Sequence, residues 1–206
     1  MMMQSAVLYL PGKGGRAAEC AHYRPLFSDC TVMGLDYADP APQAAGRQVA
    51  DVVQSMRRKY KRITLIANSI GAYYAMLAGI DGMIRKAYWI SPIVDLERLL
   101  SDMLQSVQAT EAVLREKSVI LSATGDPILW EDLCYVKAHP ARWTAPTEIL
   151  YGSADALTPY ETVAAFAEAH GAGLTVMAGG EHWFHTAEQM QFLDRWILTA
   201  ENRQGG

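Results

Sequence analysis

Cysteine is scarce in this sequence: only Cys20, Cys30 and Cys134 occur among its 206 residues. An odd number at wide spacing matches neither a disulfide framework nor the paired spacing of a zinc site. We therefore expect reduced thiols and a cytoplasmic location. The histidines show no pair spaced around a glutamate, and no dinucleotide-binding fingerprint opens the chain, so we expect no metal and no cofactor.

An excess of positive charge is also missing, because 18 Lys and Arg face 22 Asp and Glu, a formal net charge of −4. The one basic run, RRKYKR at 57–62, is short and closes a predicted helix, where its cations complement the helix C-terminus. Binding to nucleic acid needs cations for the phosphates, so we expect no nucleic-acid partner.

Long hydrophobic runs are absent as well. The apolar run before Pro11 is only about six residues long and has no basic region before it, so we expect neither a signal peptide nor a membrane span. Hydrophobic residues make up 50% of the chain and charged residues 19%, which is typical of a globular protein. We expect a single domain over residues 1–206.

Short apolar runs alternate with longer segments of helical period. This alternation predicts an α/β protein, a three-layer α/β/α sandwich whose mainly parallel sheet is covered by helices on both faces. Near-continuous apolarity within the runs indicates strands that are buried on both sides. The predicted strands are 6–10, 31–37, 62–68, 86–91, 147–152 and 174–179, and the predicted helices are 43–60, 70–80, 159–170 and 186–200.

One region breaks the alternation. Residues from about 93 to 143 have helical patterning without a convincing long strand, and a structureless loop of that size is implausible in a compact domain. We expect a helical cap insertion that lies over the sheet. Its apolar residues, including Trp130, are expected to roof an apolar pocket, although most of them pack the cap onto the sheet.

The segment ANSIG, Ala67 to Gly71, places a serine between a predicted strand and a predicted helix. A turn that abrupt holds Ser69 in strained geometry with its hydroxyl exposed, and it needs small residues on either side. The alternative is a serine that simply caps the following helix.

This segment resembles the nucleophile elbow of the α/β-hydrolase fold, small-x-Ser-x-small, with Ala67 in place of the usual first glycine. Two other loops fit the same family. Asp155 in ILYGSADALTP follows a predicted strand, as the family's acid does, and His182 in TVMAGGEHWFHT lies between the last strand and the last helix. The order Ser69, Asp155, His182 is the order of this fold. The resemblance implies a nucleophile, an orienting acid and a base, respectively.

Other residues compete for these roles. His185 is a second candidate base, but it immediately precedes the predicted helix cap. Asp95 follows the strand that ends AYWISP, and Asp126 lies in a TGDP turn within the insertion. Taken alone, the position of Asp155 favours an aspartate that simply stabilises a turn. The coincidence of three separate loops favours Asp155 and His182.

The resemblance also implies an oxyanion hole. One donor is the backbone N–H of Ile70, directly after the nucleophile. The segment LYLPGKGG at 8–15 resembles the family's H-G-x-G loop, with Pro11 in place of the histidine, which assigns the second donor to the Lys13 N–H. A phosphate-binding loop is the competing interpretation, but Gly14 and not Ser or Thr follows the lysine.

The implied function is a serine hydrolase that cleaves a carboxylic ester of a small or acyl-chain substrate through an acyl-enzyme. Gly12, Trp130 and Trp183 are expected to contact that substrate. A thioesterase or amidase would use the same triad, and a catalytically silent member of the fold would bind a small ligand or a protein instead. The oligomeric state stays open.

Overall fold

The computed structural model describes residues 3–202. Six strands form one sheet in the order β2-β1-β3-β4-β7-β8, and every neighbouring pair described runs parallel. Each coincides with a predicted strand, so the predicted parallel sheet is confirmed. The strands are β1 (Met3–Leu10), β2 (Thr31–Gly34), β3 (Tyr60–Asn68), β4 (Lys86–Ile90), β7 (Thr147–Gly152) and β8 (Gly173–Met177).

The four predicted helices are present as α1 (Pro42–Arg57), α2 (Ile70–Leu77), α6 (Tyr160–His170) and α7 (Ala187–Asn202). Two 3-10 helices, η1 (Ala17–Phe27) and η2 (Asp81–Met83), lie in connections. The sequence predicts that α6 begins at residue 159, but Pro159 is the N-cap of this helix and keeps an extended ψ of 138°. Within residues 3–202, no helix is long and apolar enough to cross a membrane.

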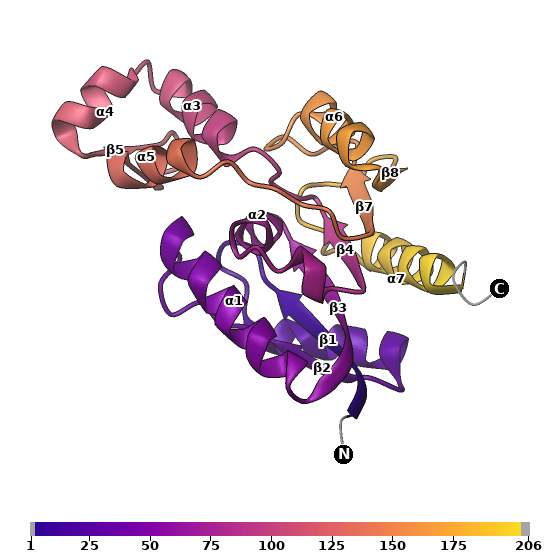
Figure 1. Ribbon diagram of the computed structural model, residues 1–206. Coiled ribbons are helices and arrows are strands. Elements are labelled where there is room, and N and C mark those ends of the chain that lie inside the picture. Colours follow the sequence, from indigo (N-terminus) through magenta and orange to yellow (C-terminus); the bar gives the residue numbers. More distant parts are fainter. Residues whose placement is uncertain (1–2, 203–206) are drawn as a thin grey trace.

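Helices lie on both sides of the sheet (Figure 1), and apolar side chains fill the space between the layers. Along β1, Ala6, Leu8 and Leu10 face a cluster formed with α1, α2, α6 and the insertion, while Val7 and Tyr9 face a second cluster formed with η1 and α7. Because successive strand residues point to opposite faces, this alternation buries both sides. The three-layer α/β/α arrangement predicted from the sequence is confirmed.

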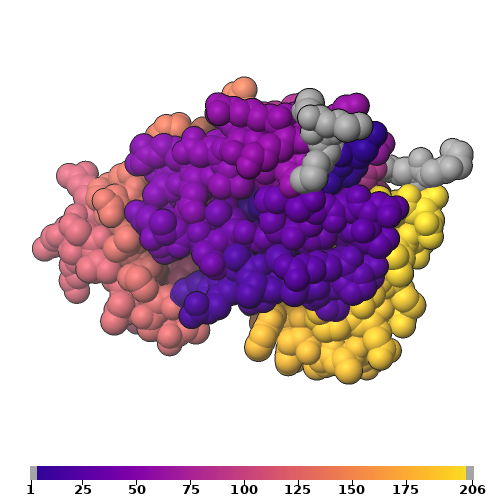
Figure 2. Space-filling view, turned by 90° about the horizontal axis from the view of Figure 1, so that it is seen from below, coloured from indigo at the N-terminus to yellow at the C-terminus, as the bar shows by residue number. Residues whose placement is uncertain are grey.

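We refer to residues 93–143 as the insertion. It leaves the sheet after β4 and returns before β7, and it projects beside α2 in Figure 1. Seen from below in Figure 2, the insertion and α7 lie on opposite sides of the N-terminal half of the chain. It contains α3 (Leu96–Ser106), α4 (Glu111–Lys117), β5 (Val119–Leu121), β6 (Pro127–Leu129) and α5 (Trp130–Ala138). The antiparallel β5–β6 hairpin is not predicted from the sequence, because each of its strands is only 3 residues long.

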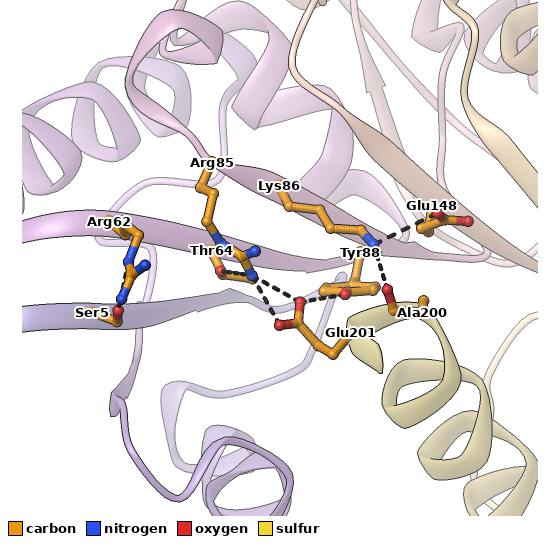
Figure 3. A network of polar contacts seen from close by, with 9 residues as sticks. All are labelled: Ser5, Arg62, Thr64, Arg85, Lys86, Tyr88, Glu148, Ala200 and Glu201. Carbon is orange, nitrogen blue, oxygen red and sulfur yellow. Dashed lines mark hydrogen bonds and ion pairs between the residues drawn. The ribbon is translucent and has the colours of Figure 1, made fainter. Parts of the chain in front are cut away.

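A lysine is buried where β4 meets the end of α7 (Figure 3). Lys86 is only 1% exposed. Its Nζ donates a hydrogen bond to the Ala200 carbonyl at 3.0 Å and lies 3.6 Å from Glu148 Oε1. The last carbonyls of a helix have no partner within the helix, so the ammonium satisfies one of them and complements the helix dipole.

The next residue of α7, Glu201, is bound from the sheet side. Arg85 donates to its carboxylate at 2.8 and 3.0 Å, and the Tyr88 hydroxyl donates to it as well (Figure 3). The end of α7 is therefore fixed to β4 at the amino end of the sheet, while its beginning follows the loop that carries His182.

Candidate active site

Ser69 links the end of β3 to the start of α2 in a strained conformation, with φ 52° and ψ −120°. A non-glycine residue with positive φ costs conformational energy and persists only when its surroundings hold it. The Ser69 N–H donates to the Ile90 carbonyl at 3.0 Å, and its own carbonyl accepts the Ile93 N–H at 3.1 Å. Ser69 occupies the N-cap position, yet its side chain makes no capping hydrogen bond, which argues against the simple capping alternative.

Gly71 explains why the elbow needs a small residue after the serine. A Cβ at this position would lie 2.7 Å from the Leu10 carbonyl oxygen and 2.9 Å from that of Pro11. Atoms this close would force the backbone apart. The constraint therefore comes from the carboxyl end of β1, which the elbow crosses, and not only from the turn itself.

The Ser69 hydroxyl is hydrogen-bonded to a histidine. Ser69 Oγ lies 2.8 Å from His182 Nε2, and His182 Nδ1 lies 2.7 Å from Asp155 Oδ2. An ionised carboxylate only accepts hydrogen bonds, so Nδ1 carries the proton, and Nε2 is left to accept the proton of the serine hydroxyl. The structure thus joins an alcohol, an imidazole and a carboxylate from three separate loops.

Asp155 is held rigidly in the loop after β7. Its Oδ1 accepts the backbone N–H groups of Leu157 at 2.8 Å and Thr158 at 3.1 Å, which leaves Oδ2 for His182. The carboxylate is 0% exposed. The two interpretations of Asp155 from the sequence are therefore compatible, because one oxygen caps the turn while the other orients the imidazole.

The rival acids and base have other partners. His185 Nδ1 lies 2.7 Å from the Trp183 carbonyl oxygen, and its ring stacks on the Trp183 indole with centroids 4.5 Å apart. Asp95 caps α3 by accepting the Arg98 N–H at 2.9 Å. Asp126 forms an ion pair with Lys13.

The loop predicted to complete an oxyanion hole lies directly beside Ser69. A Cβ on Gly12 would sit 3.1 Å from the Ser69 Cβ. The Gly15 N–H closes a turn onto the Gly12 carbonyl at 3.1 Å, and Gly14 takes a φ of 75°, which glycine adopts at little cost.

Two backbone donors are available here. Within the described part of the chain, neither the Lys13 amide nor the Ile70 amide donates a hydrogen bond to another protein group. Ile70 is the first residue of α2, where backbone N–H groups have no partner within the helix and attract negative charge.

Glu19 anchors the far end of this loop and was missed by the sequence analysis. Its Oε1 accepts the Arg16 N–H at 3.1 Å, and its Oε2 accepts the Tyr9 hydroxyl at 2.7 Å. Burial, together with Tyr23 and Glu19, raises the pKa of Tyr9, so the phenol stays a donor. The Glu19 carboxylate supplies one half of a capping box, because it accepts the N–H of the N-cap residue Arg16. An arginine side chain has no acceptor to complete the box, so the usual Ser or Thr signal is absent.

The three predicted substrate contacts lie in different environments. Gly12 is adjacent to Ser69. Trp183 follows the histidine and is 67% exposed. Trp130 begins α5 and packs, partly buried, against the apolar cluster that joins the insertion to the sheet. Among residues 3–202, no group of His, Cys, Asp or Glu has an arrangement that could hold a metal ion.

No protein-family model matches the chain, and no curated protein matches its sequence. Solved structures do resemble it. Est1E from Butyrivibrio proteoclasticus superposes with a TM-score of 0.78 at 14% identity, over 98% of this chain and 88% of that one. Alpha/beta hydrolase domain-containing protein 10 from mouse gives a TM-score of 0.73 at 16% identity, over 96% and 90%.

A thermophilic esterase, Est2 from Thermogutta terrifontis, gives a TM-score of 0.60 at 19% identity, over 97% of this chain and 81% of that one. At these identities the likeness concerns the fold. The sheet order, the elbow after β3 and these structural neighbours agree, and the chain has the α/β-hydrolase fold.

Proposed function

We propose that this protein is a serine hydrolase that cleaves carboxylic esters, with Ser69 as nucleophile, His182 as general base and acid, and Asp155 as the orienting carboxylate. The observation that carries the proposal is the continuous hydrogen-bonded chain from Ser69 Oγ through both ring nitrogens of His182 to Asp155. A nucleophile, a base within hydrogen-bond reach and a third group that orients the base are the requirements of this chemistry.

In this mechanism Ser69 Oγ attacks the ester carbonyl carbon while His182 Nε2 takes the hydroxyl proton. Asp155 stabilises the imidazolium that forms. When the tetrahedral intermediate collapses, the bond to the alcohol breaks and His182 returns the proton to the departing oxygen. Water then attacks the carbonyl carbon of the acyl-enzyme while His182 takes a proton from it. The bond between that carbon and Ser69 Oγ breaks, the carboxylic acid leaves, and His182 returns the proton to Ser69.

The negative charge that develops on the carbonyl oxygen requires preorganised donors. The amides of Ile70 and Lys13 are proposed for this role, because Ile70 directly follows Ser69, Lys13 directly follows the Gly12 that lies beside Ser69, and neither amide has a partner within the described residues. Loss of one such donor typically costs about a hundredfold or more in rate. Gly12 permits the close approach that this geometry needs.

An ester is the proposed substrate class because an esterase is among the structural neighbours and because two exposed apolar side chains follow triad residues closely in the sequence. Leu157, two residues after the acid, and Trp183, next to the base, are both exposed. Such side chains suit an apolar acyl or alkyl group. Thioesters and amides would react through the same steps, so a panel of matched ester, thioester and amide substrates ranks the three by kcat/KM.

The test combines hydrolysis of p-nitrophenyl acetate with labelling by a fluorophosphonate probe. The wild-type protein is expected to turn over the ester and to be labelled at Ser69, and Ser69→Ala is expected to lose both. Ser55→Ala, at an exposed position of α1, is the matched control and should behave like the wild type. A wild-type protein that neither reacts with excess probe nor hydrolyses any ester would instead support the silent, ligand-binding alternative.

A further inference from the structure

The Lys13 side chain extends from the loop beside Ser69 and forms an ion pair with Asp126. Asp126 lies in the turn that joins β5 to β6, so the pair connects the insertion's hairpin to the oxyanion loop, which we define as residues 11–16. The two segments are far apart in the sequence. The same residue, Lys13, supplies both the paired side chain and the proposed oxyanion donor.

The hairpin turn is built to present the Asp126 carboxylate. The Ser122 N–H donates to the Asp126 carbonyl at 2.8 Å, and the Asp126 N–H donates to Ser122 Oγ at 3.1 Å. The Thr124 hydroxyl donates to Oδ2 at 3.0 Å, which leaves Oδ1 for Lys13. Both Lys13 and Thr124 lower the pKa of Asp126, so the carboxylate is charged at neutral pH.

The oxyanion loop is held at its two ends, and in its middle by the Gly12–Gly15 backbone turn and by the Lys13 side chain. Its beginning continues β1, and its end is bound by Glu19 through the Arg16 N–H. Lys13 lies between them, followed by Gly14 with a φ of 75°. Asp126 is the partner described for the Lys13 side chain, so this contact restrains the part of the loop that carries the donor.

We propose that Asp126 is a positioning residue for the oxyanion hole, acting on the Lys13 amide through the Lys13 side chain. The inference rests on the proposed hydrolase function. It means that the insertion influences the chemical step, because the amide must point at the oxygen as charge develops there. The side chains of Lys13 and Asp126 are 65% and 40% exposed, so the effect is modest: about three- to fivefold in kcat.

A purely architectural role for the pair predicts a different result. If it only fastened the insertion to the sheet, breaking it would change substrate entry or stability, and hence KM or the unfolding midpoint. Interactions made only in the transition state change kcat with KM preserved. The division between kcat and KM therefore separates the two roles.

The kinetic experiment compares the wild type with Asp126→Asn on p-nitrophenyl acetate at low and high salt. Asp126→Asn is expected to lower kcat about three- to fivefold at unchanged KM. High salt should lower the wild-type kcat toward that of the variant and leave the variant unaffected, because salt screens exposed charges. Glu116→Gln removes an exposed carboxylate from α4 of the same insertion and should match the wild type.

Exchanging the charges gives a second kinetic arm. The double variant Lys13→Asp with Asp126→Lys is expected to recover most of the kcat that either single change loses. A kcat that is unchanged in Asp126→Asn, or a change confined to KM, overturns the proposal.

A structural arm does not depend on catalysis. Amide hydrogen exchange in the oxyanion loop should be faster in Asp126→Asn than in the wild type or Glu116→Gln. Equal exchange in all three proteins overturns the positioning role. If the wild type is neither active nor labelled at Ser69, the proposed function fails, while the exchange result still decides whether Asp126 orders the loop.

Discussion

Gly71 lies against the carboxyl end of β1, so close that a Cβ on it would meet the Leu10 carbonyl oxygen at 2.7 Å. Gly71→Ala is therefore expected to move α2 and with it Ser69. A nucleophile displaced by about 1 Å loses on the order of a hundredfold in kcat/KM. Thermal unfolding and ester hydrolysis measure the two consequences. Gly82→Ala is the control, because its Cβ would meet nothing within 4 Å, and normal activity in Gly71→Ala would contradict the packing argument.

Asp155→Asn tests the orientation of the imidazole. The asparagine oxygen still accepts the Leu157 and Thr158 amides, so the fold is expected to survive, but its NH₂ group would donate to His182 Nδ1 and place the ring proton on Nε2. That tautomer is unable to take the proton of Ser69. We expect kcat to fall on the order of 10⁴-fold.

Steady-state kinetics and fluorophosphonate labelling check this prediction. Asp95→Asn removes the rival acid, and asparagine caps a helix as well as aspartate does, so its kcat should stay at the wild-type level. A larger loss in Asp95→Asn than in Asp155→Asn would reverse the assignment of the acid.

Asp132, in the first turn of α5, makes stability depend on pH. Its partial burial, together with the charges of Glu131 and Asp39, raises its pKa to about 6. The pKa of Asp132 in the folded protein therefore lies above the value of about 3.9 that it has in the unfolded chain. The group contributes its full stabilisation below about pH 4 and loses that contribution as the pH rises through about 6. Asp132→Asn should therefore be more stable than the wild type at about pH 8, by about 1 kcal/mol after solvent screening, and equal to it at about pH 4.

Urea unfolding at both pH values measures the difference. Asp51→Asn, on the exposed face of α1, controls for the loss of one negative charge. A gain that is the same at both pH values would show that the stabilisation has another origin.

Lys86→Met should destabilise the protein without altering its chemistry. The change removes the donor to the Ala200 carbonyl and the cation beside Glu148, inside a site where water is excluded. A buried acceptor left without a partner costs about 1–3 kcal/mol. The free energy of unfolding should fall by that amount, while kcat of the folded protein is unchanged. Lys59→Met, an exposed lysine after α1, should leave the free energy of unfolding unchanged.

Much of this structure could be predicted from the sequence, for identifiable reasons. The six strands are visible in the sequence because they are apolar on both faces. Val7 and Leu8 illustrate the reason, since these neighbours in β1 point to opposite faces of the sheet and each is buried in a separate apolar cluster. Ser69, Asp155 and His182 are predictable as triad candidates because each follows a strand and their order fits a known fold, and the structure places the three side chains in hydrogen-bond contact.

Other features carried too little local signal. The β5–β6 hairpin is too short for its periodicity to be visible, and η1 contains Pro25 within an irregular pattern. The Lys13–Asp126 ion pair joins two segments that are far apart in the sequence, and no residue pattern in either segment indicates that they make contact. Such contacts depend on the tertiary arrangement of the chain.

The imidazole belongs to the loop after β8, and β8 pairs in the sheet only with β7 among the described strands. The serine elbow can form once β1, β3 and β4 have assembled, but its hydroxyl acquires a proton acceptor only when the outermost strand docks. Parallel pairings between distant segments are slow steps in folding. Reactivity toward a fluorophosphonate during refolding would therefore recover later than the helical circular dichroism signal. The length of the delay would measure how long β8 takes to pair with β7.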